Sequence, residues 1–303
     1  MYWSIYKEIR VSVEDICSNA AHIAEVLSEI QKNFPAYFNN FVKNKPAQNF
    51  AKAINNAVNE FEKDRDTYKA IFDLEALEEY EDDPNNFKSN ILKNKCPVIR
   101  KTLNSKREEL KKYKKDFKLA DPNKLLEVIT NICTFGEDYY KGYDTTTYES
   151  FKNYSDLGLA PLDEDECCLS GVIGVGIKSR ILYKLYPAIF PNARQNSIWA
   201  LYFLSGQEDF GCEYGSEFLM IDDKENFVTR QNFSYLYELF AYYAFEIYKL
   251  LEREADKINL SLEKSYRYVA VDAFLSSVAE YHAEDINIYV RQIPNGGFGY
   301  GWA

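Results

Sequence analysis

The sequence has few residues of the types that build metal sites and disulfides. Only two histidines, His22 and His282, occur among 303 residues, and the six cysteines show no Cys-X-X-Cys spacing. A zinc site made of cysteine and histidine therefore has few possible ligands. The adjacent Cys167 and Cys168 cannot easily bridge to each other. We expect reduced thiols, buried for packing, and neither a metal ion nor a cofactor.

Long apolar runs are also missing. No stretch of about 18 consecutive apolar residues occurs, and the densest apolar segment, residues 233–251, is interrupted by Ser234, Glu238, Glu246 and Lys249. The amino-terminal sequence MYWSIYKEIRVSVED carries charges throughout and lacks the basic, apolar and small-residue regions of a signal peptide. We therefore expect a cytoplasmic protein without a membrane span.

Acidic residues outnumber basic ones, but the two are unevenly distributed. The formal net charge of −11 argues against a nucleic-acid partner, because basic residues that neutralise phosphates supply most nonspecific affinity. Residues 75–83 form an acidic run, whereas residues 99–118 hold nine Lys or Arg against three acids. A solvated helix face is the simplest explanation of such a run. Residues 170–207 contain no acid at all, which favours contact with an anion. The basic residues of this acid-free segment are Lys178, Arg180, Lys184 and Arg194.

Apolar residues recur at spacings of three and four through much of the chain. This spacing predicts helices over residues 47–70, 123–133, 231–255 and 264–282. The segment 231–255 is apolar on most sides, which is typical of a buried central helix. Strand signals are sparse, and residues 217–221 are the one short candidate. We expect a mainly α fold with few or no strands.

Turn-forming residues predict breaks at residues 84–86 and 121–123 and a longer loop at 141–156. The longer loop is the best candidate for a domain boundary. We therefore expect a helical amino-terminal domain over residues 1–150 and a second helical domain over residues 151–303.

The segment IGVGIKSR, residues 173–180, carries two glycines inside the acid-free region. Apolar residues at helical spacing on both sides place the glycines in a tight turn between two short helices, a helix-hairpin-helix in the second domain. Glycine allows the backbone to approach a phosphate, and the first amides of the following helix point outward. A turn that only packs two helices is the alternative. The candidate nucleic-acid-binding residues are Gly174, Val175, Gly176, Ile177, Lys178, Ser179, Arg180 and Arg194.

The stretch LSGVIGVGIKSRILYKLYPAIFP, residues 169–191, resembles the hairpin of the helix-hairpin-helix DNA glycosylase superfamily. The family pattern Leu-Pro-Gly-Val-Gly-any-Lys-Thr-Ala fits from Gly174 to Ser179, with Ile173 in place of the proline. The resemblance implies an atypical bacterial repair or antiphage glycosylase that binds double-stranded DNA, flips out a nucleotide and removes its base. It also places Lys178 at the position of the family's Schiff-base lysine.

The sequence departs from this family at the catalytic aspartate. Asn196 stands near that position, or Arg194 when the Phe-Pro segments are aligned, and no aspartate occurs in residues 170–207. A carboxylate is needed to stabilise the positive charge that develops on the sugar. We expect Glu238 to supply it, with Asp272 as second choice and a structural ion pair as the alternative for each. Without such a carboxylate, the alternative is a noncatalytic nucleic-acid-binding or protein-interaction module.

Three residues are candidates for a pocket around the flipped base. Trp199 and Tyr235 carry rings that can stack on a base, and Asn196 adds hydrogen-bonding groups. Aromatic residues at helical spacing also build hydrophobic cores, so a core position is the alternative for both rings.

Overall fold

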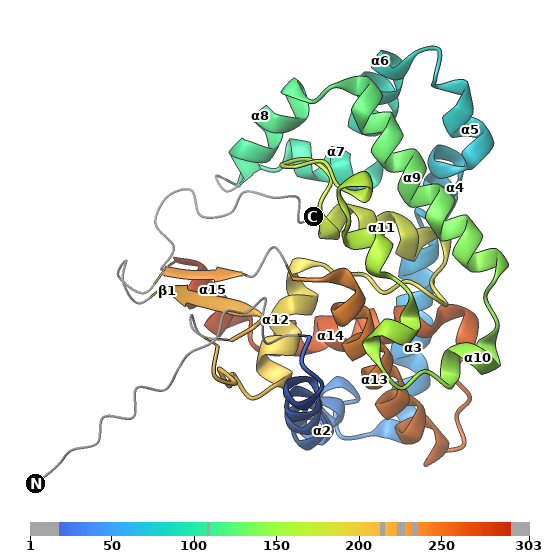
Figure 1. Cartoon of the computed structure of the whole chain (residues 1–303). Coiled ribbons are helices and arrows are strands. Elements are labelled where there is room, and N and C mark those ends of the chain that lie inside the picture. The colour runs from blue at the N-terminus through green and yellow to red at the C-terminus, as the bar shows by residue number, and fades with distance from the viewer. Residues whose placement is uncertain (1–17, 108–109, 213–215, 223–227, 232–234, 292–303) are drawn as a thin grey trace, which may run out of the picture.

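The computed structural model describes residues 18–107, 110–212, 216–222, 228–231 and 235–291. Helices make up most of this part of the chain (Figure 1), and the prediction of a mainly α fold is confirmed. The described residues contain one antiparallel sheet of two strands, β1 (Leu219–Asp222) and β2 (Val228–Gln231). The strand predicted at 217–221 corresponds to β1.

Through the first half of the chain the helices follow one another with short connections. Those of the first half are α2 (Ala20–Phe41), α3 (Pro46–Glu62), α4 (Arg65–Phe72), α5 (Leu74–Glu79), α6 (Pro84–Asn86), the π-helix η1 (Phe87–Lys95), α7 (Pro97–Asn104), α8 (Lys111–Leu119), α9 (Pro122–Lys141) and α10 (Thr145–Glu149). Three 3₁₀ helices come next, η3 (Tyr154–Leu157), η4 (Ala160–Asp163) and η5 (Asp165–Cys167). The chain continues with α11 (Val175–Leu185), α12 (Gln195–Leu204), α13 (Tyr237–Asp256), the 3₁₀ helix η7 (Lys264–Tyr266), α14 (Arg267–Tyr281) and α15 (Ala283–Arg291).

Aspartate side chains start several of these helices by accepting hydrogen bonds from otherwise unpaired amides. Asp121 accepts from the Lys124 amide at the start of α9, and Asp144 accepts from the Thr147 amide at the start of α10. Asp83 does the same for α6, with Pro84 at the first helical position. The predicted break at 84–86 is therefore a helix start, because these turn residues cap the helical segment that follows.

Two predicted helices differ from the structure at their ends. The segment 47–70 divides into α3 and α4 at Lys63 and Asp64. The segment predicted to begin at 231 becomes helical only at Tyr237, because its first residue pairs in β2. The helix predicted at 264–282 is present as η7 and α14.

The hydrophobic core forms around α12, α13 and α14. α14 packs against α12, α13 and α3, and α2 packs against α12, α13 and α14 (Figure 1). Helices from both sides of residue 150 thus contact one another, and their buried side chains form one cluster. The predicted division into two domains stays a prediction. None of the described helices is long and apolar enough to cross a membrane.

The five cysteines in the described part of the chain are free. All but Cys168 are buried. Burial raises the pKa of Cys96 and of Cys212 to about 12, so these two thiols stay protonated at neutral pH.

Gly136 allows α9 to pack closely on α11. A Cβ atom added at Gly136 would lie 2.5 Å from Leu182 Cδ2 and 3.1 Å from Tyr186 Cε2. We expect Gly136→Ala to lower the free energy of unfolding, since overpacking costs about 1–3 kcal/mol and exceeds the helix-propensity gain of about 1 kcal/mol. Urea denaturation measures the change.

Gly142→Ala at the end of the same helix is the control, because its added Cβ would meet only carbonyl oxygens at 3.8 Å. Equal stability of both variants would contradict the prediction.

Candidate nucleic-acid interface

The glycine segment forms a hairpin directly before α11. Leu169 and Ile173 pair in an antiparallel bridge, and Gly171 takes a φ of 76° at the turn between them. Gly174 is extended and is the N-cap of α11. The predicted turn between two helices is present only in part: a β-bridged turn at Gly171 follows the 3₁₀ helix η5, Gly174 caps α11, and Gly176 lies inside that helix.

The start of α11 has free space around Gly174, whereas the residues of its first turn after Val175 are buried. A Cβ atom added at Gly174 would meet no atom within 4 Å, and Val175 is half-buried. Gly176, Ile177 and Ser179 are buried, and the Ser179 hydroxyl accepts a hydrogen bond from the Ala193 amide at 3.1 Å. A phosphate can therefore approach the first residues of α11 but not the whole predicted set.

Lys178 points into the protein. Its side chain is fully buried, and its Nζ donates to the carbonyl oxygen of Leu162. The same Nζ lies 3.5 Å from Asp163 Oδ1 and 3.4 Å from Cys168 Sγ. The binding and Schiff-base roles predicted for Lys178 thus require the chain around Leu162 to open.

Glu238 is held by backbone amides rather than by a basic residue. The amides of Leu159 and Ala160 donate to its Oε1 at 2.7 and 3.1 Å. Asp163 in turn accepts from the amides of Tyr237 and Glu238, so that each carboxylate binds the start of the helix that carries the other. Burial raises the pKa of Glu238, and the two amide bonds oppose that rise.

Asp272 forms an ion pair with Arg194, one of the two residues that alignment with the glycosylase hairpin places at the aspartate position. Arg194 Nε donates to Asp272 Oδ1 at 2.9 Å, and Nη2 donates to Oδ2 at 3.0 Å. Asn192 Nδ2 also donates to Oδ1, at 3.2 Å. A carboxylate from α14 is thereby placed beside the acid-free segment by a bidentate ion pair.

Asp272 and Arg194 line a cavity of about 450 Å³ between α3, α11 and α14, here called the α14 cavity. The ion pairs on its walls are Lys63 with Glu60, Lys184 with Asp64, and Arg194 with Asp272. Arg180 adds a further guanidinium, which lies over the ring of Tyr183 at 5.6 Å. The walls therefore carry one more basic than acidic residue.

The predicted base-pocket residues lie in different surroundings. Trp199 is 1% exposed and stacks on Phe203 and Tyr289. Tyr235 is also buried, and its hydroxyl donates to Glu217 at 2.7 Å. Asn196 is on the surface. The rings of Trp199 and Tyr235 thus occupy core positions, which was the alternative to a base pocket.

Several residues that line the α14 cavity or contact its lining residues were missed in the sequence analysis. Asn192 and Ser276 both contact the Arg194 and Asp272 pair, and Asp64 pairs with Lys184. The polar run Asn-Ala-Arg-Gln-Asn within an apolar stretch was the available signal for Asn192. Asp64 and Ser276 carried none, because only the fold brings α3 and α14 to α11.

No protein-family model, curated protein sequence or solved structure matches the chain. The glycosylase resemblance of residues 169–191 therefore stays a prediction based on the residues themselves.

The raised pKa of Glu238 predicts how stability depends on pH. The folded protein holds the proton of Glu238 more tightly than the unfolded chain, whose pKa is near 4.5. Glu238 therefore contributes most to the free energy of unfolding below the pKa of the unfolded chain. This contribution is lost as the pH rises through the folded-state pKa. The stability of the wild type relative to Glu238→Gln should therefore fall as the pH rises above 4.5, which urea denaturation at a series of pH values measures.

Glu254→Gln is the matched control, because it removes a carboxylate from the same helix where Glu254 pairs with Lys257 at the surface. It measures the effect of losing a carboxylate as such. If the difference in the free energy of unfolding between the wild type and Glu238→Gln stays constant with pH, the raised pKa of Glu238 is contradicted.

Proposed function

We propose that the chain binds a nucleic-acid backbone through a surface made of the hairpin and the lysine-rich helix α8. The observation that carries this proposal is a contact: a Cβ atom added at Gly171 would lie 2.4 Å from Asp116 Oδ2, so the hairpin turn touches α8. The two segments that the sequence singled out separately are thus neighbours. The exposed lysines of α8 are Lys111, Lys112, Lys115 and Lys118.

The electrostatics of this surface suit a phosphate chain. The open first turn of α11 offers the positive end of a helix dipole, and α8 adds exposed ammonium groups that can contact neighbouring phosphates. Asp116 is the acid at the contact, and Lys112 pairs with it at 2.7 Å. Because the net charge of −11 repels nucleic acid, binding depends on this local distribution and weakens steeply with salt.

Base excision is a second candidate function, favoured by the place of Asp272. The hairpin lies at the start of α11, and Arg180 and Lys184 of the same helix line the α14 cavity that contains Asp272. Double-stranded DNA held at the hairpin would insert a flipped nucleotide there, where Arg180 attracts phosphate and the Asp272 carboxylate stabilises the charge on the sugar. Asp272 replaces Glu238 as first choice, because Asp272 lines the α14 cavity.

Removal of two α8 charges tests the binding surface. We expect Lys115→Gln with Lys118→Gln to weaken binding of duplex DNA regardless of sequence and to reduce the slope of log affinity against log salt by about 1 per lost phosphate contact. Fluorescence anisotropy at several salt concentrations measures both. Lys257→Gln at the far end of α13 is the control and should leave the slope unchanged. Equal slopes for all three proteins would contradict the proposal.

Replacement of Gly174 tests the hairpin itself. Gly174→Val should weaken DNA binding without changing helical content, because the new side chain enters open space where the phosphate would approach. Anisotropy and circular dichroism measure the two effects. A folded variant with wild-type affinity would remove the hairpin from the interface.

Asp272→Asn tests base excision. The amide keeps the shape of the side chain but loses its charge, so the variant should bind DNA and yield no alkali-labile abasic sites on duplexes with damaged or modified bases. Glu60→Gln, at another acid of the α14 cavity, should retain excision. If Asp272→Asn is as active as the wild type, the catalytic assignment is wrong. If the wild type binds but excises nothing, the binding function remains alone.

A further inference from the structure

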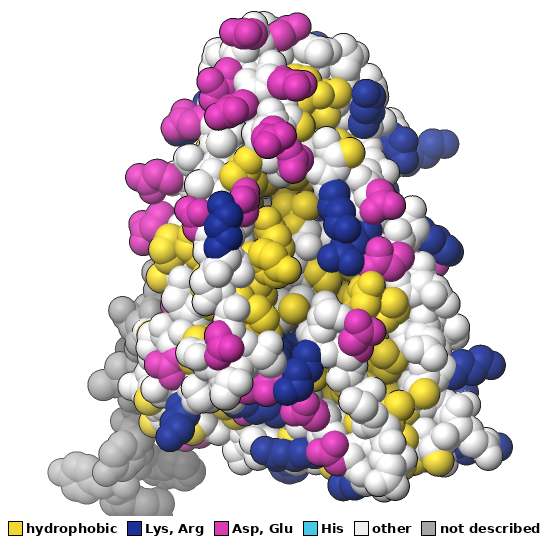
Figure 2. Space-filling model, turned by 90° about the vertical axis from the view of Figure 1, so that its right-hand side faces the viewer, with side chains coloured by type: hydrophobic (Ala, Val, Ile, Leu, Met, Phe, Trp, Pro, Cys, Tyr) yellow, Lys and Arg dark blue, Asp and Glu magenta, His cyan; other side chains and the backbone are white. Residues whose placement is uncertain are grey.

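A second cavity of about 450 Å³ lies beyond the carboxyl end of α11, among α4, the end of α9, α10 and η7. We call it the tyrosine cavity, and none of its lining residues lines the α14 cavity. Figure 2 views the side of the molecule where α9 ends and α10 begins. Hydrophobic side chains, a class that in this figure includes tyrosine, run down the middle of this face, with basic side chains beside them and acidic ones gathered toward α5 and α6.

A pair of stacked rings forms one wall of the tyrosine cavity. The rings of Tyr140 and Tyr186 lie 5.0 Å apart at an interplanar angle of 24°. Tyr140 is 53% exposed, which is unusual for so large a ring. An aromatic side chain supported on one face and open to a cavity is the arrangement on which a planar base stacks.

The charged residues that line the tyrosine cavity are basic. Arg65, Lys69 and Lys264 line the cavity, and no acidic residue does so among the described residues around it. Arg65 is compensated by Glu62 at 2.8 Å and also donates to carbonyl oxygens at the end of α11. Lys69 is exposed on α4 at the mouth of the cavity.

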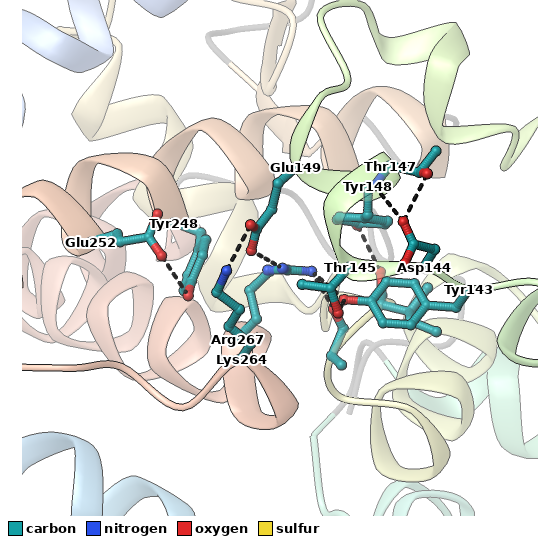
Figure 3. A network of polar contacts seen from close by, with 12 residues as sticks. Tyr143, Asp144, Thr145, Thr147, Tyr148, Glu149, Tyr248, Glu252, Lys264 and Arg267 are labelled. Atoms are coloured by element: carbon teal, nitrogen blue, oxygen red, sulfur yellow. Dashed lines mark hydrogen bonds and ion pairs between the residues drawn. The ribbon is translucent and has the colours of Figure 1, made fainter.

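Lys264 and the buried Arg267 share one carboxylate. Glu149 lies 2.7 Å from Lys264 Nζ and 2.9 Å from Arg267 Nη2, as Figure 3 shows. Arg267 Nη1 donates to Tyr143 Oη at 3.2 Å, which fixes the orientation of another ring of the cavity. Two cations against one carboxylate leave an excess of positive charge beside the rings.

We propose that the tyrosine cavity binds a nucleoside phosphate. Its base stacks on Tyr140, its phosphate lies between Lys69 and Lys264, and the hydroxyls of Thr145 and Ser265 on the same walls offer hydrogen bonds to the ribose. The volume is within the range of small-molecule sites. The ligand is either a free nucleotide or one nucleotide of a single strand, which present the same chemistry. This site stands whether or not the hairpin binds nucleic acid.

Isothermal titration of the full chain tests the proposal with four separate probes: adenosine 5′-monophosphate, adenosine, inorganic phosphate and a short single-stranded oligonucleotide. Adenosine 5′-monophosphate or the oligonucleotide should bind more tightly than adenosine or phosphate alone. Tyr140→Ala should weaken that binding roughly tenfold by loss of stacking, and Lys69→Gln about fivefold by loss of a charge. Both residues are exposed, so both variants should fold.

Tyr281→Ala is the matched aromatic control, since Tyr281 is 64% exposed outside the cavity. Lys257→Gln is the matched charge control, and both should keep wild-type affinity. Gly174→Val should also leave affinity for adenosine 5′-monophosphate unchanged, so failure of the hairpin proposal is distinguishable from failure of this one. If the mononucleotide binds, the site takes free nucleotides; if only the oligonucleotide binds and Tyr140→Ala weakens it, the site takes a strand.

Three results would overturn the proposal. The first is no binding of either nucleotide probe at millimolar concentration. The second is nucleotide binding that Tyr140→Ala and Lys69→Gln both leave unchanged. The third is inorganic phosphate binding as tightly as the nucleotide, which would leave the stacked rings without a role.

Discussion

The buried guanidinium of Arg267 is the interaction on which both cavities depend. Its side chain has no exposed surface, and it lies between the rings of Tyr148 and Tyr248 with centroid distances of 4.7 and 5.0 Å. It pairs with Glu149 and donates to the Ala188 carbonyl oxygen at 2.9 Å. A buried charge is tolerated only when its partners are in place. Arg267 therefore fixes the start of α14, α10 and the chain after α11 together, and these segments supply walls of both cavities.

Several buried charged side chains have structural roles, because they bind backbone groups. They differ in this from the charged side chains that can contact a ligand. Lys178 binds the Leu162 carbonyl oxygen, Asp163 binds the first amides of α13, and Glu238 binds the amides that begin η4. Moving any of these groups toward a substrate would leave buried polar groups without partners, which costs free energy. Asp272 and Arg180 instead line the α14 cavity, where a ligand can reach them, and they are therefore the better candidates for chemistry.

Local sequence patterns predicted the helices well and the site only in part. Apolar spacing located α9, α13 and α14, and the glycines located the hairpin, because these features depend on neighbouring residues. The pairing of Arg194 with Asp272 joins residues 78 positions apart, and no local pattern encodes it. Lys178 was misleading for the same reason: its position after the glycines suggested an exposed cation, whereas the packing of η4 against α11 and α13 buries it.

α11 connects the hairpin with both cavities. The hairpin precedes its first residue, Arg180 on its side lines the α14 cavity, and Leu185 at its end lines the tyrosine cavity. Its 11 residues span about 16 Å at the rise of an α-helix. The close contact at Gly136 locks α11 against α9, and interiors packed to this density resist sliding. A phosphate at the hairpin and a nucleotide at either cavity would thus be held at fixed separations by one rigid helix.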